Sequence, residues 1–99
     1  MVDREEIVNA LHTVEDPELG MDIVELGLFY ETEIDGPRVK VLHSLTSMGC
    51  PAGPMIQESI HDAVAALPGV EQVDVELTFD PPWTPDLMSD DAKFILGFG

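Results

Sequence analysis

Apolar residues near the start of the chain recur at helical intervals, at Ile7, Ala10, Leu11 and Val14. Just before them, Asp3 and Glu6 have the spacing of a capping box, in which two side chains bond to free N–H groups of the first turn. The pattern predicts a helix that ends before Pro17, because a residue preceding proline is pushed out of the α region. A second stripe of this period predicts a helix that ends at Pro68-Gly69. Its apolar members are Ile56, Ile60, Ala63, Val64 and Leu67.

Three further segments alternate apolar and polar residues, which is the period of a half-buried β-strand. The first covers 28–34, and a turn at 35–37 joins it to a second strand that ends near Thr46. The apolar face of this second strand carries Val39, Val41 and Leu45. Ser44 is therefore expected on the opposite face. The third strand, over 73–79, shows the clearest alternation in the chain.

The elements follow one another as α-β-β-α-β-α, with Ser89 as the N-cap of a short last helix. We expect an α+β fold, a single two-layer domain over 1–99 in which the helices pack on a small three-stranded mixed sheet. A right-handed β-α-β crossover makes the second and third strands parallel if they share the sheet. The pattern leaves open whether the third strand lies beside the first or the second.

Composition narrows the possible partners and the compartment. The 99 residues include 4 basic and 20 acidic side chains, a net charge of −16, which argues against nucleic acid and anionic membranes as partners. A 44% apolar content and a mean hydropathy of +0.09 still indicate a folded chain. The start of the chain lacks the pattern of a signal peptide, and no apolar run approaches the ~20 residues that span a bilayer. We therefore expect a cytoplasmic protein.

The strongest candidate for chemistry is Cys50, the one cysteine in the chain. It lies between Gly49, which permits a sharp turn, and Pro51, which suits a first helical turn. If the helix starts here, its N-terminus lowers the pKa of the thiol and makes a thiolate available as metal ligand or nucleophile. Pro54 allows a later start with a weaker effect. The plain alternative is that Cys50 is a small buried hydrophobe.

Two carboxylates and one aromatic side chain are secondary candidates. Asp16 and Glu18 flank Pro17, so they could bind a hard cation or orient a metal on the thiolate, or they could form only a turn. Trp83 lies in the proline-rich loop 80–86, where it either plugs the end of the core or contacts a partner.

Histidine patterning and enzyme motifs add no further site. Histidines 12, 43 and 61 show no metal-ligand spacing, and His43 shares a strand face with Val41, which suggests a hydrogen-bonded core histidine. The sequence contains no phosphate-binding glycine loop, no nucleophile elbow and no histidine placed to activate Cys50. We therefore do not expect an enzyme.

Taken in order, several short motifs resemble the SufT and PaaD-like family of iron–sulfur cluster assembly domains. They are Asp16-Pro17-Glu18-Leu19, residues 23–30, Thr46 with Gly49-Cys50-Pro51, Leu67-Pro68-Gly69-Val70 and residues 80–85. The resemblance implies an accessory factor that assembles iron–sulfur clusters or delivers them to client apoproteins. It also implies a binding set of Asp16, Glu18, Thr46, Gly49, Cys50 and Pro51, in which Cys50 is the metal ligand.

Several expectations accompany this resemblance. One thiolate cannot hold a cluster alone, so an iron–sulfur cluster or iron would be held transiently and shared between protomers of a homodimer, or with a small thiol or a client cysteine. Similar domains are fused to P-loop ATPases elsewhere, so a nucleotide-driven step would require a partner ATPase carrier. The alternative is a metal-free adaptor that docks assembly or client proteins through the Cys50 and Trp83 loops.

The acidity generates the first testable prediction. We interpret it as halophilic adaptation to a cytosol with molar salt, where the screening length falls from ~10 Å to ~3 Å, rather than as an ordinary solvated surface. The melting temperature should rise steeply between dilute buffer and molar KCl in a thermal denaturation series. A melting temperature indifferent to KCl would remove this interpretation.

Overall fold

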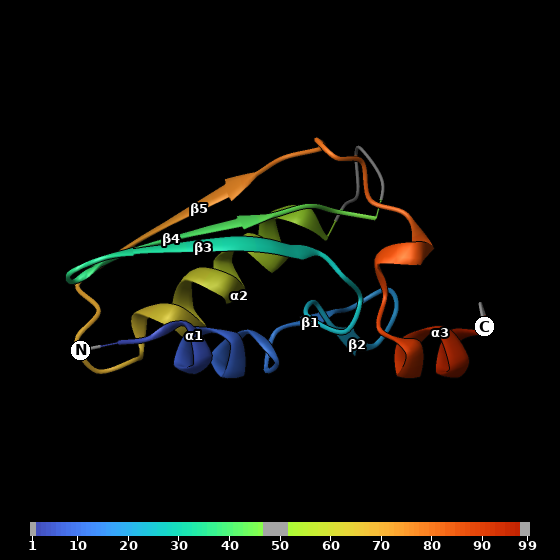
Figure 1. Cartoon of the computed structure of the whole chain (residues 1–99), viewed down its shortest axis with the longest axis horizontal. Helices are drawn as coiled ribbons and strands as arrows, with labels where there is room; N and C mark the ends of the chain where they lie inside the picture. The colour runs from blue at the N-terminus through green and yellow to red at the C-terminus, as the bar shows by residue number, and fades with distance from the viewer. Residues whose placement is uncertain (1, 47–51, 98–99) are drawn as a thin grey trace.

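The computed structural model describes residues 2–46 and 52–97, and Figure 1 shows their arrangement. Its helices are α1 (Arg4–Leu11), α2 (Gly53–Ala65), the 3₁₀ helix η1 (Pro85–Leu87) and α3 (Asp90–Leu96). Its strands are β1 (Glu15–Asp16), β2 (Met21–Asp22), β3 (Phe29–Asp35), β4 (Arg38–His43) and β5 (Gln72–Leu77). Among these residues, none of the helices combines the length and the apolar character needed to cross a bilayer.

The larger sheet has the order β3-β4-β5. β3 and β4 form an antiparallel hairpin, whereas β4 and β5 run parallel from the pair Arg38 and Gln72 to the pair His43 and Leu77. The third predicted strand therefore lies beside the second, which settles the order that the pattern left open. α1 and α2 lie on one side of this sheet in Figure 1, so the predicted two-layer α+β fold is confirmed.

The core lies between the sheet and these two helices. Both predicted helices and the second predicted strand supply fully buried residues, which include Ile7, Leu11, Val39, Val41, Ile56, Ile60 and Val64. The third predicted strand contributes only partly buried side chains, among them Val73 and Val75. A further set comes from the segment between β2 and β3, where Ile23, Leu26 and Leu28 are 0% exposed. Burying a side chain of this size contributes roughly 1.5–3 kcal/mol. This segment is thus as much a part of the core as the helices.

Several predicted boundaries were wrong. α2 ends at Ala65 and β5 at Leu77, each about two residues earlier than the sequence pattern predicts. α1 ends at Leu11 rather than just before Pro17, because the chain turns and residues 15–16 pair with 21–22 as a small antiparallel sheet. β4 ends at His43 rather than near Thr46. Ser44 is accordingly buried and not on the open face, since its N–H donates to the carbonyl of Leu28 (2.8 Å).

Both predicted caps are present. The backbone N–H of Glu6 donates to Oδ1 of Asp3 (2.9 Å), and the N–H of Ala92 donates to Oγ of Ser89 (3.1 Å). The proline-rich loop also contains η1, which begins at Pro85 and which the sequence did not predict. Proline tolerates this position because the first residues of a helix have no internal partner for their N–H groups.

Gly27 offers a direct test of how the C-terminal segment packs. It has φ +78°, and an added Cβ would lie 2.2 Å from the carbonyl oxygen of Leu87. We expect Gly27→Ala to cost more than the roughly 1–2 kcal/mol of a left-handed alanine, because the Leu87 backbone must also move. Urea denaturation measures the free energy of unfolding.

The matched control is Gly36→Ala in the β3–β4 turn. Gly36 also has a positive φ, +59°, but its Cβ would have no neighbour within 4 Å. This variant should lose only the conformational penalty. Equal losses of stability in the two variants would contradict the close approach of Leu87 to Gly27.

Candidate functional site

Asp16 is a buried carboxylate in the turn between β1 and β2. Its side chain is 1% exposed, and its Oδ1 accepts the backbone N–H of Glu18 (2.8 Å). Its carbonyl accepts the N–H groups of Leu19 (3.2 Å) and Gly20 (2.8 Å), so the turn is tightly closed around Pro17. The local sequence explains this shape, since aspartate before proline readily caps a turn.

The second oxygen of this carboxylate, Oδ2, is sealed from solvent and has no hydrogen-bond partner among the described residues. A buried polar atom without a partner costs about 1–3 kcal/mol. Such a group is retained in a fold only if something offsets that cost. Asp16 is therefore the best-defined polar group for receiving a ligand or another polar side chain at this end of the molecule.

Glu18 lies two positions after Asp16 in the chain, but its side chain faces solvent, and a joint cation site of the two carboxylates stays a prediction. The Glu18 side chain is exposed, and the contact recorded between the two residues is the backbone N–H bond. The sequence allowed either a cation site or a simple turn here. A turn accounts for the exposed Glu18, but it does not by itself account for the burial of the Asp16 side chain.

Thr46 is half-buried and follows β4 by three positions. Gly49, Cys50 and Pro51 lie outside the described residues, so their predicted roles stay predictions. Figure 1 shows the β1–β2 turn, the end of β4 and the start of α2 in the same half of the long axis.

α2 uses the later of the two starts that the sequence allowed. It begins at Gly53, with Ala52 as an N-cap that makes no side-chain hydrogen bond and Pro54 in the first turn. Cys50 therefore precedes the first helical residue by three positions. The effect of a helix dipole falls off quickly beyond its end, so the later start favours the weaker of the two dipole effects that the sequence left open.

His43 is a fully buried histidine at the end of β4. Its Nδ1 lies 3.1 Å from the carbonyl oxygen of Ser44, and its Nε2 has no partner among the described residues. Burial lowers the pKa of His43 below 6.5, and the hydrogen bond to Ser44 opposes this only in part. The predicted core histidine is confirmed.

Trp83 fastens the proline-rich loop to the core. Its Nε1–H donates to the carbonyl of Leu26 (2.7 Å), and its ring packs against the core cluster. Tyr30 Oη–H donates to the carbonyl of Pro81 (2.8 Å), which fixes the same loop from the sheet side. The plug interpretation accounts for these contacts, and partner binding by Trp83 stays a prediction.

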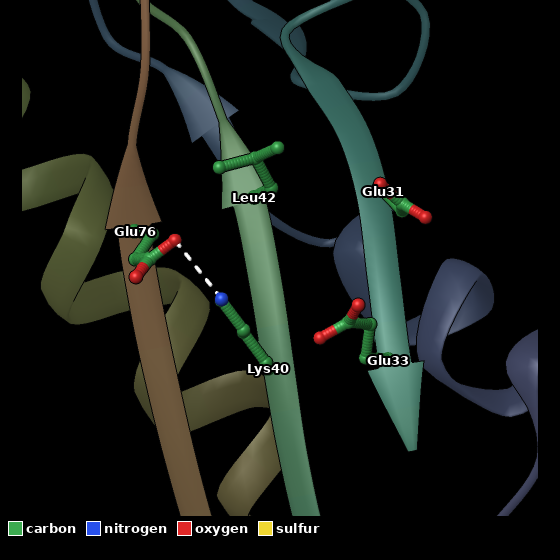
Figure 2. Close-up of a pocket in the computed structure, with 5 residues that line it drawn as sticks. All are labelled: Glu31, Glu33, Lys40, Leu42 and Glu76. Carbon is green, nitrogen blue, oxygen red and sulfur yellow. Dashed lines mark ion pairs between the residues drawn. The ribbon is translucent and has the colours of Figure 1, made fainter.

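The sheet face away from the helices is acidic. Figure 2 shows side chains from all three strands of this face, with Lys40 paired to Glu76 (3.2 Å). The hydrogen bond and charge of Glu76 raise the pKa of Lys40, which stands beside Glu33 as well. An exposed pair of this kind stabilises little. The hollow between these side chains is only about 50 Å³, too small for an organic ligand.

A larger groove of about 540 Å³ runs between this face and the loop that carries Trp83. Its lining is mostly apolar and includes Val24, Phe29, Tyr30, Leu42, Pro81 and Leu87. Glu31 and Asp80 add acidic groups. The groove has the size and character of a surface that accepts part of another molecule.

Sequence reasoning missed one cluster completely. His12, Asp22 and Glu25 come from three segments, and one donor atom from each lies within 4.8 Å of the others. Histidine spacing gave no hint, because the histidine has no second histidine near it. The capping-type spacing of Asp22 and Glu25 is the one local signal that could have marked a structured turn.

Comparison with known proteins assigns the chain to a family. The family described as iron–sulfur cluster assembly protein matches residues 4–77. The chain belongs to this family. Asp16, Thr46 and Cys50 lie inside the matched span, whereas Trp83 lies beyond it.

Individual relatives of the family resemble almost the whole chain. The Fe–S protein maturation auxiliary factor YitW of Bacillus subtilis is 46% identical over 95 residues, which covers 95% of this chain and 93% of that protein. The auxiliary factor SufT of Staphylococcus aureus is 46% identical over 83 residues, covering 83% and 94%. A solved domain from Bacillus anthracis superposes with a TM-score of 0.91 at 34% identity, covering 96% and 92%. The resemblance read from the sequence is thus confirmed, as is the fold.

The lowered pKa of His43 predicts a specific acid sensitivity. The unfolded chain takes up a proton near pH 6.5 more readily than the folded chain, so the free energy of unfolding falls as the pH drops through that value. For one proton, the free energy of unfolding changes by at most about 1.4 kcal/mol per pH unit. His43→Leu should therefore lose less stability than the wild type between about pH 8 and pH 5.5 in urea denaturation.

His61→Leu is the matched control, because His61 is exposed on α2. This variant should keep the pH dependence of the wild type. An unchanged pH dependence in His43→Leu would show that His43 does not contribute to acid sensitivity.

Proposed function

We propose that this protein is a non-enzymatic accessory factor in the maturation of iron–sulfur proteins in the cytoplasm. In this role it carries iron or an iron–sulfur cluster briefly to client apoproteins, with Cys50 as its thiolate contact. Family membership and the relatives named as Fe–S protein maturation auxiliary factors support this proposal. The structural observation that carries it is the buried Asp16 carboxylate, whose Oδ2 has no hydrogen-bond partner among residues 2–46 and 52–97.

The chemistry favours a transient carrier. A single thiolate leaves the other iron positions of a cluster to a second protomer, a small thiol or the client. Transfer is then an exchange of ligands, in which a client thiolate replaces the Cys50 thiolate and the iron keeps its oxidation state. A buried carboxylate whose Oδ1 is held by the Glu18 N–H can orient an incoming group without binding the metal tightly.

A second candidate is an adaptor that docks assembly or client proteins and holds no metal. The apolar groove beside the Trp83 loop favours it, because such a groove accepts side chains of a partner and its acidic groups attract basic ones. A nucleotide-driven step, in either case, would come from an ATPase partner.

Anaerobic reconstitution with iron and sulfide tests the proposal. We expect sulfur-to-iron charge-transfer absorption in the wild type and none in Cys50→Ser. Asp16→Asn keeps the size of the side chain but removes the charge, and should weaken metal retention by about tenfold, the loss typical of an orienting group. Absorbance titration and transfer to an apoprotein are the measurements.

Glu58→Gln is the control, because Glu58 is an exposed carboxylate on α2. It should behave as the wild type. Full absorption in Cys50→Ser would contradict the thiolate role. Absence of absorption in every protein, together with client binding that Cys50→Ser leaves unchanged, would support the adaptor instead.

A further inference from the structure

The cluster of His12, Asp22 and Glu25 lies apart from the groups considered so far. His12 is the C-cap of α1, Asp22 belongs to β2, and Glu25 follows in the turn before β3. Their side chains offer one imidazole nitrogen and carboxylate oxygens, a donor set that suits borderline divalent transition ions. We propose that these three side chains form a binding site for a divalent transition ion such as Zn²⁺, independent of Cys50.

Distances between the donor atoms fit such an ion. Bonds of about 2.0–2.1 Å separate neighbouring ligand atoms by roughly 3.0 Å in an octahedral site and 3.4 Å in a tetrahedral one. His12 Nδ1 and Asp22 Oδ1 are 3.1 Å apart, which lies within this range. All three donor atoms lie within 4.8 Å, so Glu25 has to close by at most about 1.4 Å for a tetrahedral site and about 1.8 Å for an octahedral one.

The surrounding hydrogen bonds hold both carboxylates in place. Asp22 Oδ1 accepts the N–H groups of Val24 (3.0 Å) and Glu25 (2.9 Å). Ser89 Oγ–H donates to Oε2 of Glu25, which leaves Oε1 for the ion. Bonds of this outer kind orient ligands and raise metal affinity.

The charge at the cluster also favours a cation. Neither Asp22 nor Glu25 pairs with lysine or arginine among the described residues, so no permanent positive charge of the described part of the chain stands against the two carboxylates. The Asp22 side chain is 18% exposed and that of His12 is 38% exposed. This partial burial strengthens attraction to an ion while leaving a route for its entry.

An ion at this position would tie together segments that are distant in sequence. It would join the end of α1 to β2 and, through Glu25 and Ser89, to the N-cap of α3. Three protein donors leave further positions for water, as in an open metal site.

Zinc titration of the Cys50→Ser protein tests this proposal. Because this variant lacks the Cys50 thiolate, the result does not depend on the role proposed for that thiolate. Calorimetry in molar KCl with excess Mg²⁺ suppresses unspecific attraction to the acidic surface. We expect one equivalent of Zn²⁺ to bind and to raise the melting temperature, because a ligand specific to the folded state stabilises it. His12→Ala and Glu25→Gln should each weaken binding by about tenfold or more.

His61→Ala is the matched control. His61 Nδ1 lies 3.4 Å from Asp62 Oδ1, which gives a similar histidine and aspartate pair without the third ligand. This variant should bind Zn²⁺ as tightly as its Cys50→Ser parent. Equal affinity in the His12 and His61 variants, or no stoichiometric binding at all, would overturn the proposal. Circular dichroism of the metal-free proteins verifies that each variant is folded.

Discussion

The backbone of residues 25–28 holds distant parts of this chain together. Its carbonyl groups accept the N–H of Ser89, the indole N–H of Trp83 and the N–H of Ser44. These donors come from the cap of α3, the proline-rich loop and the exit of β4. This turn, in which Leu26 and Leu28 are fully buried, thus offers its carbonyls to three segments, and each lost bond would leave a backbone acceptor without its partner.

This arrangement explains why the buried polar side chains, those of Asp16, His43 and Ser44, lie toward one end of the molecule. Where the chain leaves β4, the N–H of Ser44 donates to the carbonyl of Leu28. The β1–β2 turn with Asp16 directly precedes the same buried segment in the sequence. The other end of the sheet consists of an exposed hairpin turn at Gly36. Burial of Asp16 and of His43 follows from a rigid frame that excludes water, and the altered pKa of His43 is one of its results.

Features that depend on neighbours in sequence could be predicted. Val39 and Val41 alternate with polar residues, and Asp3 and Ser89 stand in front of amphipathic or acidic turns, so the three longer strands were found, though not all their ends, and both caps were correct. β1 and β2 were missed because two residues cannot display a period. The cluster of His12 was missed for a different reason, since its members are brought together only by tertiary packing.

Both outer strands of the three-stranded sheet, β3 and β5, leave backbone groups free to pair with another chain. Carboxylates line both strands, with Glu31, Glu33 and Asp35 on β3 and Asp74 and Glu76 on β5. Two copies that approach edge to edge therefore repel each other. Because dissolved salt screens charges, it weakens this repulsion between the edges of two copies as well as the repulsion among carboxylates within one copy.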